Sequence, residues 1–382
     1  MDFAKSGTDS IGLELEFQLL DSDSYDLVDG ILPLMELCSD NRYLTPEFIQ
    51  NTVEIASKKC FSIQDLESHL LETTRNLQQN VSKLNMRLCA AGTHPFSTAL
   101  AHVTPTPRYL QMEQAERYRS HTQITFATHV HLGMQSAEDA ITMLRAIKPF
   151  LPLVLALSAN SPFWHGQDTY YASYRHRVLA STRSYGMPPT FNSWNEFETF
   201  FDISKRAGLY NSVKDIHWDA RPSPNLGTLE IRVMDAQSTV SDAVCRAAFL
   251  QALVYYLRDK VTSEKAAKYY EYEYWLEKDN LYQASHLGLN AAQTGWHGEY
   301  TIARSNLSLL QLFEEVLNDI VNFIQSSEKY KNSVDLGYLY RLDAQLHEPY
   351  GYQLQRNLYA ERLSLKAVTK SMVERLSKEL AD

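Results

Sequence analysis

Three short stretches of the sequence carry acidic, imidazole or guanidinium side chains at a two-residue spacing. They are, in chain order, Glu14 with Glu16, His129 with His131, and Glu230 with Arg232. Carboxylate oxygens suit Mg²⁺ or Mn²⁺, an imidazole is compatible with either ion, and magnesium commonly accompanies nucleotide phosphates. Arg232 offers a planar donor that can grip phosphate or carboxylate oxygens with two hydrogen bonds. These residue types together point to phosphoryl transfer.

Apolar residues alternate with these side chains, which predicts a half-buried strand in each stretch. The strands are expected at residues 11–19, 123–132 and 228–233. Because successive side chains in a strand point to opposite faces, each chemical pair shares the face away from the apolar residues. Carboxylates collected on one face are unfavourable unless cations neutralise them. The pattern therefore predicts a metal-binding face.

Each pair taken alone also has a structural explanation. An isolated Glu14 and Glu16 pair is more often a solvated face, and two histidines at this spacing can hydrogen-bond across a sheet. Glu230 and Arg232 can form an ion pair within a sheet. The occurrence of all three pairs on separate alternating strands favours the functional interpretation.

Helical periodicity predicts the elements that surround these strands. Helices are expected at residues 62–88, 137–158, 242–258, 307–324 and 363–380. Ser62 with Asp65 provides an N-terminal cap for the first of them. The stretch 161–193, rich in proline and tyrosine, is either a boundary or a long active-site loop. We expect a single catalytic domain over residues 1–382, with a helical C-terminal part.

Composition limits the class of protein. The chain has 382 residues, 44% of them hydrophobic, and a formal net charge of -10, which opposes non-specific binding to nucleic acid or to an anionic membrane. The four cysteines form no C-x-x-C pair, which is typical of a reducing compartment. We find no secretory leader and no run of about 18 apolar residues. A cytoplasmic protein is expected.

Several ordered motifs resemble those of the type-2 glutamate–cysteine ligase family, which includes bacterial carboxylate–amine ligases. They include IGLELEF, TPEFIQNTVEIASKKC, AGTHPF, THVHLGM and HWDARPSPNLGTLEIRVMDAQST. The resemblance covers most of the chain. It implies an α+β, glutamine-synthetase-like catalytic fold, in which helices pack on the outer face of a curved, mainly antiparallel sheet. It also suggests a homodimer.

The same resemblance implies the site residues. Glu14 and Glu16 would bind different magnesium ions. The further metal ligands would be His129, Glu230, Glu47 and Glu54. His131 would be either a ligand or a hydrogen-bonded support for one.

The resemblance gives the arginines separate roles. Arg232 would contact the transferred phosphoryl group. Arg221 would touch ATP phosphates or the acyl-phosphate site, with a buried structural arginine as the alternative. Arg175 and Arg183 would hold the carboxylates of an amino-acid substrate, unless they are surface arginines of a polar loop. His286 stands where the family usually has arginine, which affects either nucleotide contact or acceptor preference.

The implied reaction uses Mg²⁺ (or Mn²⁺) and ATP. A substrate carboxylate, by family default the γ-carboxylate of glutamate, attacks the γ-phosphorus and forms an acyl phosphate. An amine then displaces phosphate and leaves an amide, ADP and phosphate. Two alternatives stay open: a guanidino-kinase-like phosphotransferase, and a non-catalytic protein that binds Mg·ATP on the same scaffold. Pocket shape decides the true substrate pair, and one sequence does not reveal it.

Overall fold

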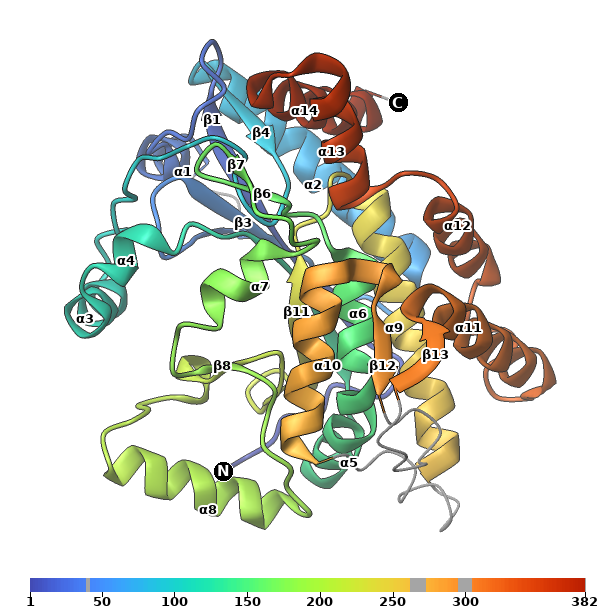
Figure 1. Ribbon diagram of the computed structural model, residues 1–382. Helices are drawn as coiled ribbons and strands as arrows, with labels where there is room; N and C mark the ends of the chain where they lie inside the picture. Colours follow the sequence, from blue (N-terminus) through green and yellow to red (C-terminus); the bar gives the residue numbers. More distant parts are fainter. Residues whose placement is uncertain (39–41, 262–272, 295–303, 382) are drawn as a thin grey trace.

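An antiparallel sheet forms the centre of the protein. The structure is a computed structural model, and it describes residues 1–38, 42–261, 273–294 and 304–381. The sheet has seven strands in the order β10-β11-β5-β1-β3-β2, and β4 pairs with β1 beyond this path. The strands are β1 (Ile11–Asp21), β2 (Leu44–Pro46), β3 (Thr52–Ala56), β4 (Met86–Cys89), β5 (Ala127–Gly133), β10 (Ala220–Ser223) and β11 (Thr228–Asp235). This arrangement confirms the expected antiparallel α+β architecture (Figure 1).

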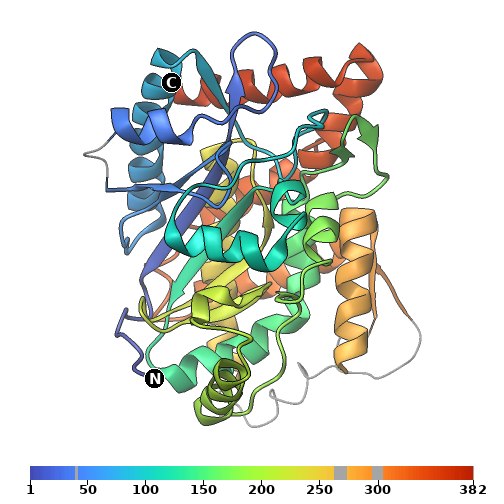
Figure 2. The same cartoon turned by 90° about the vertical axis from the view of Figure 1, so that its left-hand side faces the viewer.

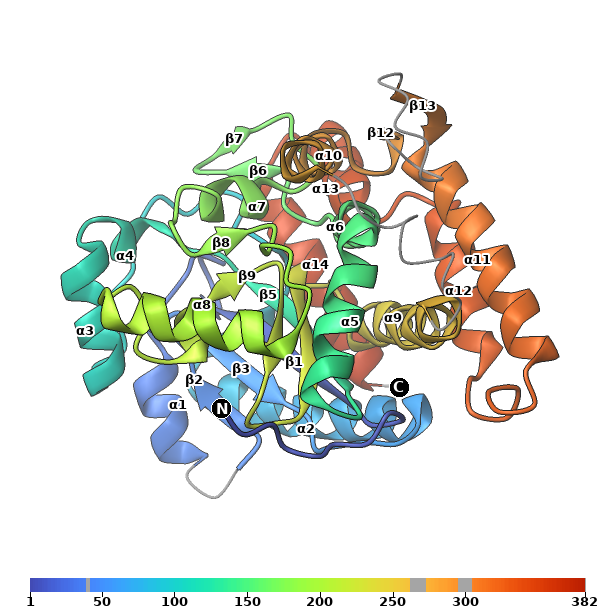
Figure 3. The ribbon, with the colours of Figure 1, turned by 90° about the horizontal axis from the view of Figure 1, so that it is seen from below.

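Helices pack against the apolar face of this sheet. The helices that contact its strands include α2 (Ile63–Lys83), α5 (Ala137–Ile147), α6 (Leu151–Ser158), α9 (Val240–Val261) and α14 (Leu365–Ala381). Figure 3 shows the sheet lying between α2 and α9 on one side and the α3 (Pro107–Glu116) and α8 (Trp194–Arg206) segments on the other. One apolar cluster runs from Ile11 in β1 to Leu380 in α14. The assignment of the whole chain to one catalytic domain stays a prediction.

The C-terminal third of the chain is mainly helical, as expected. It contains α10 (Tyr274–Leu287), α11 (Leu309–Ser326), α12 (Leu336–Leu346), α13 (Gly351–Arg362) and α14. The short strands β12 (Ala292–Thr294) and β13 (Arg304–Ser308) pair with each other before α11 begins. Because α14 contacts both β4 and α2, this part of the chain packs back onto the N-terminal sheet strands.

Two strand predictions are confirmed, and one needs a correction. Along β1 the odd positions from Ile11 are buried and the even positions 12, 14 and 16 are half-buried, as alternation requires. The strand expected at residues 123–132 begins at Ala127 rather than at residue 123. Gln123 instead ends the short helix α4 (Arg119–Thr122), because the chain turns before it enters the sheet.

Two helix predictions were too long. The helix expected at 62–88 ends at Lys83, because Asn85 adopts a positive φ of 55° and the chain then enters β4. The helix expected at 137–158 is split by the 3₁₀ turn Lys148–Phe150, where Pro149 lacks an N–H for the helical ladder. The predicted cap is confirmed, since Ser62 accepts a hydrogen bond from Asp65 N.

Two stretches have the length and apolarity of a membrane span. In Ala137–Ser158 and Val240–Val261, 89% and 83% of the most apolar window is buried inside the protein. A core helix passes the same test of length and composition, so these stretches are accounted for by the packing around the sheet.

The buried His94 fixes the chain that follows β4. Its Nε2 donates to Tyr25 O at 2.9 Å, and its Nδ1 accepts from Ser97 N at 2.9 Å. Protonation of Nδ1 would remove that acceptor. Burial lowers the pKa of His94 to about 4, although the Tyr25 carbonyl opposes this shift.

This environment predicts that stability falls with acidification. The folded-state pKa of His94 lies below the unfolded value of about 6.5, so its stabilising effect is complete above pH 6.5 and is lost as the pH falls towards 4. Between pH 7 and 5 the wild type should lose about 2 kcal/mol more unfolding free energy than His94→Gln, which cannot titrate. Urea unfolding at both pH values measures this difference. Equal losses in the two proteins would contradict it.

Candidate active site

Cross-strand pairing brings the expected site residues onto one face of the sheet. Glu14 lies opposite His129 across β1 and β5, and Glu16 lies opposite Glu54 across β1 and β3. Further along, Glu230 of β11 lies between its partners His131 on β5 and Arg221 on β10. The face predicted from alternation therefore runs without interruption across five neighbouring strands, β3, β1, β5, β11 and β10.

A cavity of about 630 Å³ opens on this face. Figure 2 shows the segment of α3 and α4 lying in front of the sheet there, and residues of both helices line the cavity. The lining includes all the expected metal ligands and three of the four expected arginines: Glu14, Glu16, Glu47, Glu54, His129, Glu230, Arg175, Arg221 and Arg232. Neither Arg183 nor His286 is among the lining residues.

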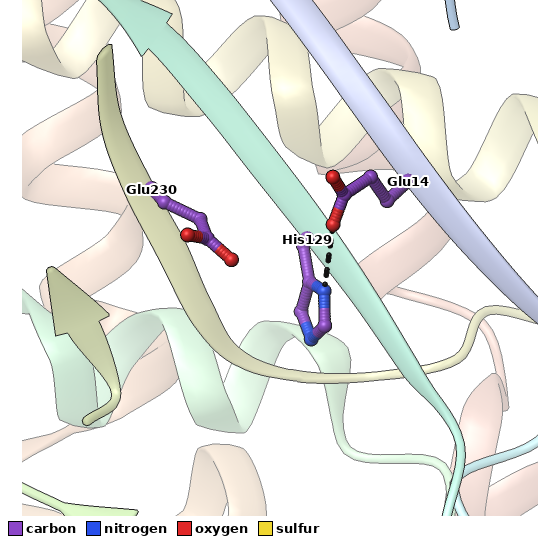
Figure 4. Close-up of side chains that lie close together, drawn as sticks. All are labelled: Glu14, His129 and Glu230. Carbon is purple, nitrogen blue, oxygen red and sulfur yellow. Dashed lines mark hydrogen bonds and ion pairs between the residues drawn. The ribbon is translucent and has the colours of Figure 1, made fainter. Parts of the chain in front are cut away.

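His129 has the geometry of a metal ligand with a fixed tautomer. Its Nδ1 donates to Glu14 Oε2 at 3.1 Å (Figure 4), while its buried Nε2 has no hydrogen-bond partner among the described residues. Burial lowers the pKa of His129, and Arg232 adds to the effect, so the ring is neutral and Nε2 keeps its lone pair.

Two groups of ligand atoms meet at this imidazole. One contains Glu14, His129 and Glu230, the other Glu16, Glu54 and His129, and in each group the atoms lie within 4.8 Å of one another. Oxygen ligands with a single imidazole suit Mg²⁺ or Mn²⁺. The residues present therefore fit the metal that the sequence predicted.

His131 differs from His129 because both of its ring nitrogens have hydrogen-bond partners. Its Nε2 donates to Glu14 Oε1 at 3.1 Å and its Nδ1 lies 2.9 Å from Thr228 Oγ1, so both nitrogens are engaged. Burial favours the neutral ring, but Glu14 outweighs it and raises the pKa of His131. The pKa of Glu14 is lowered in turn, because His131 and His129 overcome the opposing effect of burial.

The remaining carboxylates are destabilised as ions. Burial raises the pKa of Glu16, Glu47 and Glu54, and neighbouring carboxylates raise it further. The effect is largest at Glu54, which faces the charges of Glu14, Glu47 and Glu16. Like charges placed directly opposite on adjacent strands are unfavourable, and a bound divalent cation would relieve this repulsion.

Glu230 is held by two arginines. Arg221 Nε donates to Glu230 Oε2 at 2.7 Å and its Nη2 to Oε1 at 3.2 Å, while Arg232 Nη1 donates to Oε1. Burial opposes ionisation, but Arg221 and Arg232 hold the pKa of Glu230 well below its usual range. The ion pair considered in the sequence is thus present. It coexists with the metal-ligand geometry, because a carboxylate offers about four lone-pair sites.

The two arginines differ in the donors they leave free. Arg221 Nη1 donates to the carbonyls of Val213, Lys214 and Ile216, so all three of its nitrogens are engaged and it matches the structural alternative. Arg232 Nε is buried and has no partner among the described residues. Arg232, which lines the cavity, therefore retains an unpartnered donor.

The other two expected arginines lie in different environments. Arg175 is buried, and its Nη1 and Nη2 donate to the carbonyls of Val233 and Arg232 at 3.3 and 3.4 Å. Arg183 is exposed and donates to Leu209 O at 3.4 Å. The structure thus brings Arg175 to the site and leaves Arg183 outside it.

His286 lies beside the loop 161–193 rather than in the cavity wall. Its ring centroid is 4.7 Å from that of Tyr171, and its carbonyl accepts from Ala172 N at 3.1 Å. His286 therefore contacts the loop from α10, through its ring and through its carbonyl.

The sequence interpretation missed a stacked aromatic pair in the cavity wall. Tyr185 and His217 stack with ring centroids 5.2 Å apart and an interplanar angle of 11°. They belong to β8 (Tyr185–Gly186) and β9 (His217–Trp218), which pair in parallel and are too short to show alternation. The signal that could have found His217 is its place two residues before Asp219 in the HWDARPSP motif.

Comparisons with known sequences agree with the motifs. The profile described as "Glutamate-cysteine ligase family 2(GCS2)" matches residues 10–377. A Trichormus variabilis protein named "Putative glutamate--cysteine ligase 2" is 38% identical over 383 residues, which cover 100% of this chain and 96% of that protein. A Legionella pneumophila protein named "Putative glutamate--cysteine ligase 2-1" is 33% identical over 339 residues, which cover 87% of this chain and 84% of that protein.

Solved structures share the fold at low sequence identity. A glutamate–cysteine ligase from Francisella tularensis in complex with AMP has a TM-score of 0.67 and 14% identity, covering 100% of this chain and 92% of that one. A bifunctional glutathione synthetase from Pasteurella multocida has a TM-score of 0.64 and 14% identity, covering 97% and 52%. These matches confirm the glutamine-synthetase-like fold.

The fold and the family profile define an ATP-dependent carboxylate–amine ligase. The chain belongs to glutamate–cysteine ligase family 2.

Proposed function

We propose that this ligase is ADP-forming and joins its substrates through an acyl phosphate, with glutamate and cysteine as the first pair to test. The observation that carries the proposal is a cavity lined by both groups of metal ligands, which share His129, and by Arg232, whose Nε has no hydrogen-bond partner among the described residues. The names of the relatives support glutamate and cysteine. The proposed location is the cytoplasm, and a homodimer is the proposed assembly.

The metal would be held by the carboxylate face. Glu14 and Glu230 would form one site and Glu16 and Glu54 a second beside it, and the one unprotonated nitrogen of His129, Nε2, would complete one of the two. Glu47, which shares the buried cluster with Glu54, would complete the ligand set. A divalent ion bound there would neutralise phosphate charge and orient the nucleotide.

Two arginines would have separate roles, one on the transferred phosphoryl group and one on Glu230. Arg232 would donate from its guanidinium to the phosphoryl oxygens as the carboxylate attacks, which stabilises charge that develops in the transition state. Arg221 would keep Glu230 ionised and in place through its two hydrogen bonds. Helices α3 and α4, which lie over the cavity, would limit the access of water, which would otherwise hydrolyse the acyl phosphate before the amine attacks.

The products of ATP distinguish this mechanism from its alternatives. With a carboxylic acid and an amine both present, we expect equal amounts of ADP, phosphate and amide, in a screen that starts with glutamate and cysteine and extends to other acids and amines. AMP with pyrophosphate would contradict the proposal.

The same screen separates the two remaining alternatives. A stable phosphorylated guanidine formed without an amine acceptor would indicate a guanidino kinase. Tight Mg·ATP binding that persists in Glu230→Gln, with no turnover dependent on any acid, would indicate a binding protein.

A further inference from the structure

The main chain of β11 is irregular at the residue proposed to stabilise the transferred phosphoryl group. The pairing of β11 with β5 shifts between Ile231 and Met234, which lie opposite Val130 and Thr128. Arg232 and Val233 therefore both oppose the single residue His129. Such a bulge leaves main-chain groups outside the ladder and re-aims the side chains next to it.

Arg175 donates hydrogen bonds to main-chain carbonyls at this bulge. Its guanidinium donates to Val233 O and Arg232 O, and only 4% of the residue is exposed. Buried carbonyl groups without a partner are costly, so these hydrogen bonds stabilise the bulged conformation. An arginine that gripped a substrate carboxylate would instead present these same two nitrogens to the cavity.

His176, the residue after Arg175, acts on the main-chain N–H of Arg232 through Asp219. Arg232 N donates to Asp219 O at 2.8 Å, and His176 Nε2 donates to Asp219 Oδ1 at 3.2 Å. Arg175 and His176 both belong to α7 (Tyr174–Leu179). One short helix thus fixes the carbonyl of Arg232 directly and its N–H through Asp219.

Asp235 ties this helix to the strand that it supports. The carboxylate is fully buried and accepts from Ser161 Oγ at 2.7 Å, Ser173 Oγ at 2.8 Å and Asn160 N at 2.8 Å. Ser161 Oγ accepts in turn from Arg175 N at 3.0 Å. Asp235 lies three residues beyond Arg232 on β11 and is not among the residues that line the cavity.

We propose that Arg175 is a positioning residue that acts through Arg232: anchored by Asp235, it locks the β11 bulge so that the Arg232 guanidinium points at the reacting phosphoryl group. This inference rests on the proposed function, and it replaces the substrate-carboxylate role that the family resemblance suggested for Arg175. A misplacement of about 1 Å at a reacting group can lower the rate about 10²-fold, so loss of the contacts that hold the bulge is expected to lower kcat.

Steady-state kinetics separates positioning from substrate binding. Arg175→Lys keeps the charge but cannot reach both carbonyls, and Asp235→Asn weakens the anchor without changing a cavity residue. Both variants should lower kcat by about 10²-fold while the KM for the carboxylate substrate changes by less than about 3-fold. Arg206→Lys, at an exposed position of α8, is the matched control and should behave as wild type. A raised KM with an unchanged kcat in Arg175→Lys, or no kinetic change, would overturn the proposal.

Hydrogen–deuterium exchange tests the lock without any need for activity. Peptides that span β11 should exchange about 10-fold faster in Arg175→Lys and Asp235→Asn than in wild type and Arg206→Lys, because the bulge opens more often. Unchanged protection of β11 in both variants would overturn the positioning role. A wild type without ligase activity would instead count against the proposed function, so the two failures are distinguishable.

Discussion

Arg232→Lys is expected to lower kcat by about 10²- to 10³-fold, with a much smaller effect on the KM for ATP. Lysine preserves the positive charge next to Glu230 but lacks the planar guanidinium, whose Nε has no hydrogen-bond partner among the described residues. An interaction made mainly in the transition state lowers kcat when it is removed. Initial rates of ADP release at saturating substrates measure the loss.

Two controls accompany this variant. Its melting temperature should stay close to that of wild type, because the ion pair with Glu230 keeps its charges. Arg362→Lys, in the last turn of α13, should retain full activity. A kcat within a factor of about two of wild type in Arg232→Lys would remove Arg232 from the proposed mechanism.

Glu54→Gln is expected to abolish metal-dependent activity without destabilising the metal-free protein. Glutamine keeps the shape of the side chain and removes a carboxyl group whose ionisation opposite Glu16 is unfavourable, so the metal-free variant should be more stable by about 0.2–1 kcal/mol at neutral pH. Loss of an outer partner of a metal ligand costs about 10- to 100-fold in affinity or activity, and loss of a ligand should cost at least as much.

Thermal unfolding with and without Mg²⁺ measures both effects. At a metal concentration of about 100 times Kd, the wild type should gain about 2.7 kcal/mol, and Glu54→Gln should gain far less. Glu374→Gln on α14, which is 63% exposed, should respond to the metal as wild type does. An equal Mg²⁺ response in Glu54→Gln would contradict its role as a ligand.

Alternation revealed the strands that have one covered face and one face towards the cavity. In β1 the burial of every second residue gives a readable pattern around Glu14 and Glu16. In β3 the apolar Val53 and Ile55 flank Glu54, which lines the cavity, but the strand covers only the five residues Thr52–Ala56, and Glu54 was reached only through the family resemblance. Glu47 follows directly after a strand of three residues, which is too short to be recognised.

The roles of the arginines depended on features that the sequence does not display. The partners of Arg175 are backbone carbonyls at Arg232 and Val233, and a bulge cannot be located without knowing the register of β11 against β5. Arg221 was left open between a phosphate contact and a structural role, and its carbonyl partners come from the turn before β9. Residue types thus predicted the metal face, whereas hydrogen bonding to the main chain assigned the arginines.

Transfer of ¹⁸O from the carboxylate substrate to phosphate tests the central claim most directly. Attack of a carboxylate oxygen on the γ-phosphorus, followed by displacement of phosphate by the amine, leaves that oxygen in the released phosphate. With glutamate labelled in its carboxylates, or with whichever acid supports ADP release, we expect one ¹⁸O in phosphate for each amide formed. Unlabelled phosphate, or label recovered in AMP, would contradict an acyl-phosphate ligase.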